Sequence, residues 1–173
     1  MNPLPIIINN LQFAKQKQAL SGALDAMAFD RISETLVATD QQGASLNPVV
    51  RYQLSGWMDV QHRPFLKLEI DAHLSMICQR CLSAMPVHLN LSFTYMVTSQ
   101  TEEEMLVNEE MDDAIDLLAE NERMDVGLLI EDELLMALPI APVHADACAH
   151  LAMSSGDKVN PFAALEKLKN TKK

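Results

Sequence analysis

The sequence has few aromatic residues and few glycines, and these shortages exclude several kinds of protein. Phe, Trp and Tyr make up 5% of the 173 residues, so the core must rely on aliphatic side chains and on the eleven methionines, which pack adaptably. The five glycines form no phosphate-binding loop. No GxSxG or HExxH motif occurs either. We therefore expect a protein that is not an enzyme.

Long apolar runs and a disulfide framework are also missing. The longest apolar run, 134–143, has about ten residues, roughly half the length of a membrane-spanning helix. The first residues lack the basic region of a secretory signal. Three cysteines are an odd number for a disulfide framework. These features predict a cytoplasmic protein, in which thiols stay reduced.

The negative charge is concentrated in one stretch of the sequence. The formal net charge is −11, and residues 102–133 hold fourteen acidic side chains against a single basic one, Arg123. Such a surface repels phosphate and attracts basic proteins. The seven basic residues of 1–101 are dispersed, whereas direct readers of nucleic acid cluster Lys and Arg among aromatics. The charge pattern favours a protein partner over a nucleic acid.

Apolar and polar residues alternate in three consecutive segments after Pro48, which is typical of half-buried strands. The segments are 50–55, 65–77 and 87–95. Their short connections predict an antiparallel meander, because parallel pairing needs a longer crossover. We expect Gly56 to bend or bulge the first strand.

Helical signals flank this meander. Residues 11–20 have helical spacing before Gly22, and Asp125 is typical of the N-cap of a helix from Val126 to about Leu138. Residues 115–118 predict a short return strand. The fold class expected is therefore α+β, an antiparallel β-meander packed with a few helices, including one near 126–138.

We expect one α+β domain over residues 1–153, with a mobile acidic excursion at about 101–113. Residues 154–173 predict a polar linker and a short C-terminal helix. That helix would present Phe162, Leu165 and Leu168 on one face. This stripe fits docking onto its own domain, or a tethered peptide that binds elsewhere.

Cys78 and Cys81 form a CxxC motif between two predicted strands. A zinc knuckle uses such a tight turn, whereas a redox pair prefers a helix N-terminus. A structural zinc site needs four ligands, and the candidates for the others are His144 and Cys148, with His150 as a substitute. Arg80 would partly offset the thiolate charge. The alternative is a pair of reduced thiols at a sheet end, with His144 capping the preceding helical region.

The remaining carboxylates and histidines give weaker indications of a catalytic or metal-binding role. Adjacent carboxylates on a helix diverge by about 100°, so Glu131, Asp132 and Glu133 are expected on a solvated face or toward a partner. His73 and His88 are isolated in the sequence, as is His62, and surface or packing roles are expected for them.

Three segments together resemble the YceD family, the large ribosomal RNA subunit accumulation proteins of bacteria and plastids. They are the CxxC motif after an alternating strand, residues 130–144 with Cys148 beyond them, and the terminal 160–165. Their order and spacing are similar to the family's over nearly the whole chain. Some members carry more cysteines after the proline-rich segment, where this chain has Cys148 and two histidines.

The resemblance implies a role in the synthesis, processing or stability of 23S ribosomal RNA, without implying a catalytic residue. The resemblance does not indicate what the chain binds, but the charge pattern favours a non-enzymatic factor that binds a ribosomal protein, a ribonuclease or a pre-ribosomal particle. A module that binds ribosomal RNA directly is the alternative, and no constellation supports an RNA hydrolase. The predicted partner-binding residues are Glu102, Glu103, Glu104, Glu109, Glu110, Glu131, Asp132, Glu133 and Phe162.

Overall fold

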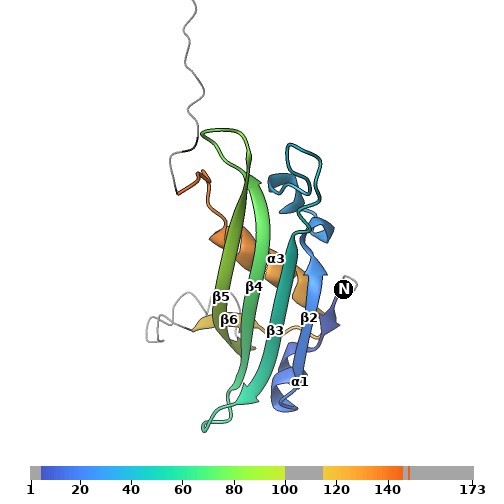
Figure 1. Ribbon diagram of the computed structural model, residues 1–173. Coiled ribbons are helices and arrows are strands. Elements are labelled where there is room, and N and C mark those ends of the chain that lie inside the picture. The colour runs from blue at the N-terminus through green and yellow to red at the C-terminus, as the bar shows by residue number, and fades with distance from the viewer. Residues whose placement is uncertain (1–4, 100–114, 146–147, 149–173) are drawn as a thin grey trace, which may run out of the picture.

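A computed structural model of the chain describes residues 5–99, 115–145 and 148, and its main feature is a five-stranded sheet (Figure 1). The strand order is β2-β3-β4-β5-β6. The strands span Ala19–Asp25 (β2), Val49–Met58 (β3), Pro64–Ile77 (β4), Ala84–Thr98 (β5) and Asp116–Ala119 (β6). The sheet and its helices confirm the α+β class.

Strands β3, β4 and β5 form the predicted antiparallel meander. Alternate side chains of β3, such as Val50 and Leu54, are fully buried, while Arg51 and Gln53 between them are exposed. The same alternation in β4 and β5 gives the sheet one apolar face and one polar face. The hydrophobic core therefore lies on one side of the sheet, and the other side is a broad polar surface.

Strand β6 corresponds to the return strand predicted over residues 115–118. The sequence did not predict which strand it pairs with. It runs parallel to β5, with Tyr95 opposite Asp116. The buried Asn10 fastens this region to the N-terminal segment. Its side-chain amide donates to the carbonyl of Ala119 at 2.8 Å, and its side-chain oxygen accepts from the N–H of Asn121 at 2.9 Å.

Helix α3 (Val126–Ala137) crosses the apolar side of the sheet (Figure 1). It begins as predicted at Asp125, whose carboxylate accepts a hydrogen bond from the Gly127 N–H at 2.8 Å. Val126, Ile130 and Leu134 are fully buried in the core. Just before the helix, β7 (Met124–Asp125) pairs with β1 (Ile7–Ile8) in a separate two-stranded sheet. The predicted helix near 126–138 is confirmed.

The predicted helix over 11–20 is only partly correct. Helix α1 spans Asn10–Lys15, and the chain enters β2 at Ala19. Between them Lys17 adopts a left-handed backbone with φ of 51°, which reverses the chain. Pairing with β3 outweighs the helical spacing of these residues, because each residue of β2 has a partner there.

Gly56 does not form a bulge in β3, which was one of the two predicted roles. It pairs in regular register with Leu66. A glycine is needed because the backbone of α1 lies directly against it: an added Cβ would sit 2.8 Å from the Cα of Ala14 and 2.8 Å from the carbonyl oxygen of Phe13. The glycine therefore allows α1 to pack on the sheet.

Two short 3-10 turns, Ala26–Ala28 (η1) and Ser33–Thr35 (η2), carry the chain from β2 toward β3. The predicted acidic excursion at 101–113, the linker and the C-terminal helix lie outside the described residues. In the part of the chain that is described, no helix has both the length and the hydropathy to cross a membrane.

Replacing Gly56 with Ala tests the close approach of α1. Because the clash is with backbone atoms, we expect Gly56→Ala to lower the free energy of unfolding by about 1–3 kcal/mol. Ser55→Ala, one position along the same strand, should change it by less than about 0.5 kcal/mol. Urea denaturation measures both. Equal stability of the two variants would show that α1 moves away at little cost.

Candidate metal centre

The turn between β4 and β5 holds Cys78 and Cys81. Cys78 follows directly after β4, its N–H donates to the Ser83 carbonyl at 2.9 Å, and its carbonyl accepts from the Leu82 N–H at 2.9 Å. Leu82 adopts a left-handed backbone with φ of 59°. This tight turn brings both thiols to the same end of the hairpin.

The segment after α3 returns to this turn. The Gln79 N–H donates to the carbonyl of Pro142 at 2.8 Å, and the Arg80 guanidinium donates to the carbonyl of His144 at 3.3 Å. Pro142 is buried at this contact. These bonds place His144 and Cys148 beside Cys78 and Cys81, although more than sixty residues separate the two pairs.

The four side chains predicted as ligands converge. One ligand atom from each of Cys78, Cys81, His144 and Cys148 lies within 4.8 Å of all the others. The Sγ atoms of Cys78 and Cys148 are 3.8 Å apart, and the Sγ of Cys81 is 3.5 Å from Nδ1 of His144. With Zn–S bonds of about 2.3 Å, thiolates at a tetrahedral zinc lie about 3.7 Å apart. The arrangement can therefore hold a metal ion.

The environment of Cys78 favours its thiolate. Burial opposes ionisation, but backbone N–H groups of Cys81, His144 and Arg80 lower the pKa of Cys78 to about 5. The Ser83 hydroxyl, whose oxygen is 2.8 Å from the Cys81 sulfur, is the main cause that lowers the pKa of Cys81. Hydrogen bonding to Cys78 raises the pKa of His144. The cluster thus places two thiols with lowered pKa values, those of Cys78 and Cys81, beside hydrogen-bond donors.

Arg80 lies against the cluster, as expected from its place within the CxxC motif. Its Nε donates to the Cys148 sulfur at 2.9 Å, and this contact is the main cause that raises the pKa of Arg80. The ring of His144 faces the Cys81 sulfur, which fits a ligand better than a helix cap. A guanidinium beside three thiols offsets part of their charge when they ionise.

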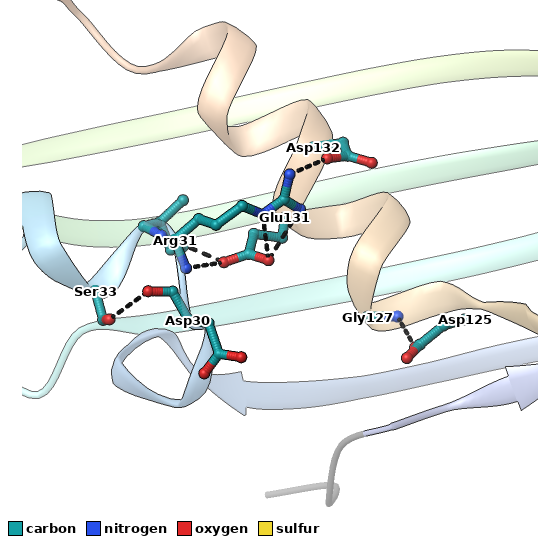
Figure 2. Close-up of polar contacts among 8 residues, drawn as sticks. Asp30, Arg31, Ser33, Asp125, Gly127, Glu131 and Asp132 are labelled. Carbon is teal, nitrogen blue, oxygen red and sulfur yellow. Dashed lines mark hydrogen bonds and ion pairs between the residues drawn. The ribbon is translucent and has the colours of Figure 1, made fainter.

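Glu131 is not on a solvated helix face, so that prediction is wrong. It is 2% exposed, and its carboxylate accepts from the N–H groups of Arg31 at 2.6 Å and Ile32 at 3.2 Å. The Arg31 guanidinium pairs with Glu131 at 2.9 Å and with Asp132 at 2.7 Å (Figure 2). The adjacent carboxylates share one cation because the long arginine side chain reaches across the helix surface.

Of the other predicted partner-binding residues, the structure describes Glu133 but not the acidic residues of 102–110 or Phe162. Glu133 accepts a hydrogen bond at 2.7 Å from the hydroxyl of Tyr95, a buried residue that the sequence did not single out. Glu102, Glu103, Glu104, Glu109, Glu110 and Phe162 lie outside the described residues. Partner binding by these acidic residues and by Phe162 stays a prediction.

Two of the three histidines expected to be isolated, His73 and His88, contact each other. His73 and His88 stack with ring centroids 4.3 Å apart, and both contact Asp71. The signal was present in the sequence: once the turn at 78–83 sets the hairpin register, residue 73 falls opposite residue 88.

Comparison with known proteins identifies one family. The family model "Large ribosomal RNA subunit accumulation protein YceD" matches residues 66–169. A relative from Haemophilus influenzae that bears the same name is 24% identical over 180 residues, covering 96% of this chain and 96% of the relative. No solved structure matches the chain.

Glu131→Ala tests the buried carboxylate. It leaves two backbone N–H groups without their acceptor, so we expect a loss of about 2–4 kcal/mol in the free energy of unfolding. Asp132→Ala, which removes an exposed carboxylate bound to the same arginine, should cost less than about 0.5 kcal/mol. Chemical denaturation of both variants measures the difference. Equal losses would contradict the buried role.

The same residue predicts a pH dependence. Burial raises the pKa of Glu131, but the bonds from Arg31 and Ile32 outweigh it and hold the pKa below the ordinary value of 4.5. A lowered pKa stabilises the fold above 4.5, and this contribution is lost as the pH falls through the folded-state pKa. The stability difference between wild type and Glu131→Ala should therefore shrink below pH 4.5.

Proposed function

Because the chain belongs to the YceD family of large ribosomal RNA subunit accumulation proteins, we propose that it supports accumulation of that RNA by binding a protein partner, without catalysing a reaction. The family match carries this proposal. The matched residues 66–169 include most of β4, all of β5 and α3, and all four members of the metal-ligand cluster. The relative is matched over almost its whole length, so a role shared by whole proteins is the simplest inference.

Charge favours a protein over RNA as the direct partner. Asp116 in β6 and Glu120 and Glu122 beyond it are exposed at the edge of the sheet. They continue an acidic run that begins at residue 102. Phosphates within a Debye length of about 8 Å would be repelled, whereas a basic ribosomal protein would be attracted. On α3, Glu131 is buried, whereas Asp132 pairs with Arg31 through Oδ1 but stays exposed, so Asp132 is the better contact.

We further propose that the Cys78, Cys81, His144 and Cys148 cluster binds one structural zinc ion. Four protein ligands close the coordination sphere, whereas catalytic zinc keeps a position open for water or substrate. The ion would join the β4–β5 turn to the segment that follows α3. Because Cys78 is fully buried and the other three ligands are partly buried, a substrate would have limited access to the ion.

Zinc content tests this centre. We expect about one zinc per chain in the purified protein, lost in Cys78→Ser and Cys148→Ser because three ligands hold zinc less tightly than four. His150→Gln, a change of the alternative histidine, should retain it. Chelation should lower the melting temperature of the wild type. Metal-free protein with unchanged stability would leave only a hairpin that bears thiols.

Charge neutralisation tests the partner. Glu120→Gln with Glu122→Gln should slow association with a basic large-subunit ribosomal protein at low salt, and the difference should fade at high salt. Asp30→Asn with Glu34→Gln removes the same charge from exposed positions outside the acidic run and should have a smaller effect. Extending the first set to Glu102, Glu103, Glu104, Glu109 and Glu110 should lower 23S ribosomal RNA levels in cells. Biosensor kinetics and RNA quantification measure these effects.

Two outcomes would count against the protein-partner proposal. If both double variants slow association equally, the acidic run acts only through net charge. Tight binding of the wild type to bare ribosomal RNA at physiological salt would favour the alternative, in which the protein binds RNA directly.

A further inference from the structure

A second group of metal-ligating side chains lies on the polar face of the sheet, away from the cysteines. It consists of Asp71 and His73 from β4 and His88 from β5. The Nε2 atoms of His88 and His73 lie 2.6 Å and 3.3 Å from the same oxygen, Oδ1 of Asp71. One ligand atom from each residue lies within 4.8 Å of the others. Three ligand atoms therefore converge on one small volume.

The hairpin register builds this group. His73 and His88 are directly opposite each other in the β4–β5 ladder, where facing side chains are close neighbours. Asp71 is two residues from His73, so it points to the same face. On its other side, Oδ2 of Asp71 is 3.9 Å from the guanidinium of Arg51, which lies opposite it in β3. Arg51 approaches one carboxylate oxygen and leaves Oδ1 to the two imidazoles.

We propose that Asp71, His73 and His88 bind a divalent transition-metal ion such as Zn²⁺. Two imidazoles and a carboxylate are a ligand set that zinc accepts, at bond lengths of about 2.0–2.2 Å. Such bonds place tetrahedral ligand atoms about 3.3 Å apart, which is the distance already present between His73 and Asp71. His88 needs to withdraw by less than about 1 Å on the same geometry, and its side chain is 56% exposed and unobstructed by the core.

This centre differs in kind from the cysteine cluster. The side chains are 40–56% exposed, so an ion can enter from solvent. Three protein ligands leave a fourth position for water or an external ligand atom. The ion would also link β4 to β5 at the His73–His88 pair of the ladder, and binding to the folded state alone stabilises that state.

Calorimetric titration of Zn²⁺ into metal-stripped, reduced protein tests the proposal. The variants are His73→Gln and His88→Gln, and the control is His62→Asn. His62 is exposed in the β3–β4 turn with φ of 61°, a conformation that Asn tolerates. We expect two binding events in the wild type and in the control. Each Gln variant should reduce the zinc affinity of the lower-affinity event alone, by at least roughly tenfold.

The outcomes separate this centre from the cysteine cluster. One event in the wild type that disappears in His88→Gln supports the surface centre and overturns the zinc proposal for the cysteines. One event that is unchanged in both Gln variants overturns the surface centre alone. No event overturns both. Imidazole resonances of His73 and His88 that shift with the second equivalent, together with a rise in melting temperature absent from His88→Gln, would confirm where that ion binds.

Discussion

The register of the β4–β5 hairpin is the constraint on which both candidate metal centres depend. Pairing of Ile77 with Ala84 closes the turn that carries Cys78 and Cys81. The same register places His73 opposite His88 on the polar face. A slip of β4 by one residue would turn each of its side chains to the other face, which would bury His73 and expose Leu74 and Ala72. Burial of the apolar set therefore also holds the polar ligands in place.

The buried carboxylate of Glu131 has a corresponding role on the apolar side. It connects α3 to the chain at Arg31 and Ile32, which belong to the irregular segment between β2 and β3. The carboxylate supplies the acceptor for two N–H groups of that segment. Ile32 is fully buried beneath the helix, so electrostatic and hydrophobic contacts act at the same place. Helix α3 in turn positions the chain that returns to the cysteine turn.

Charged side chains are distributed differently over the polar face of the sheet and over its β6 edge. The polar sheet face is nearly balanced, with Arg51 and Lys67 beside Asp71 and Glu69. The described acidic excess lies at the β6 edge and on α3. A basic partner attracted to that edge would approach a short strand at the end of the sheet rather than the face that carries the histidines. The proposed histidine metal centre and the proposed partner surface therefore lie on separate parts of the molecule.

The sequence by itself determined the elements with strong local signals. Period-two alternation identified β3, β4 and β5, and Asp125 marked the start of α3, because these patterns depend on neighbouring residues only. The four metal-ligand candidates could also be named from residue type and spacing. Tertiary structure decided what local patterns leave open: that Ala19 joins a strand, that Gly56 admits a helix backbone, that Glu131 is buried and that His73 meets His88. Each of these depends on a partner at least fifteen residues away along the chain, and contacts with that partner outweigh local preference.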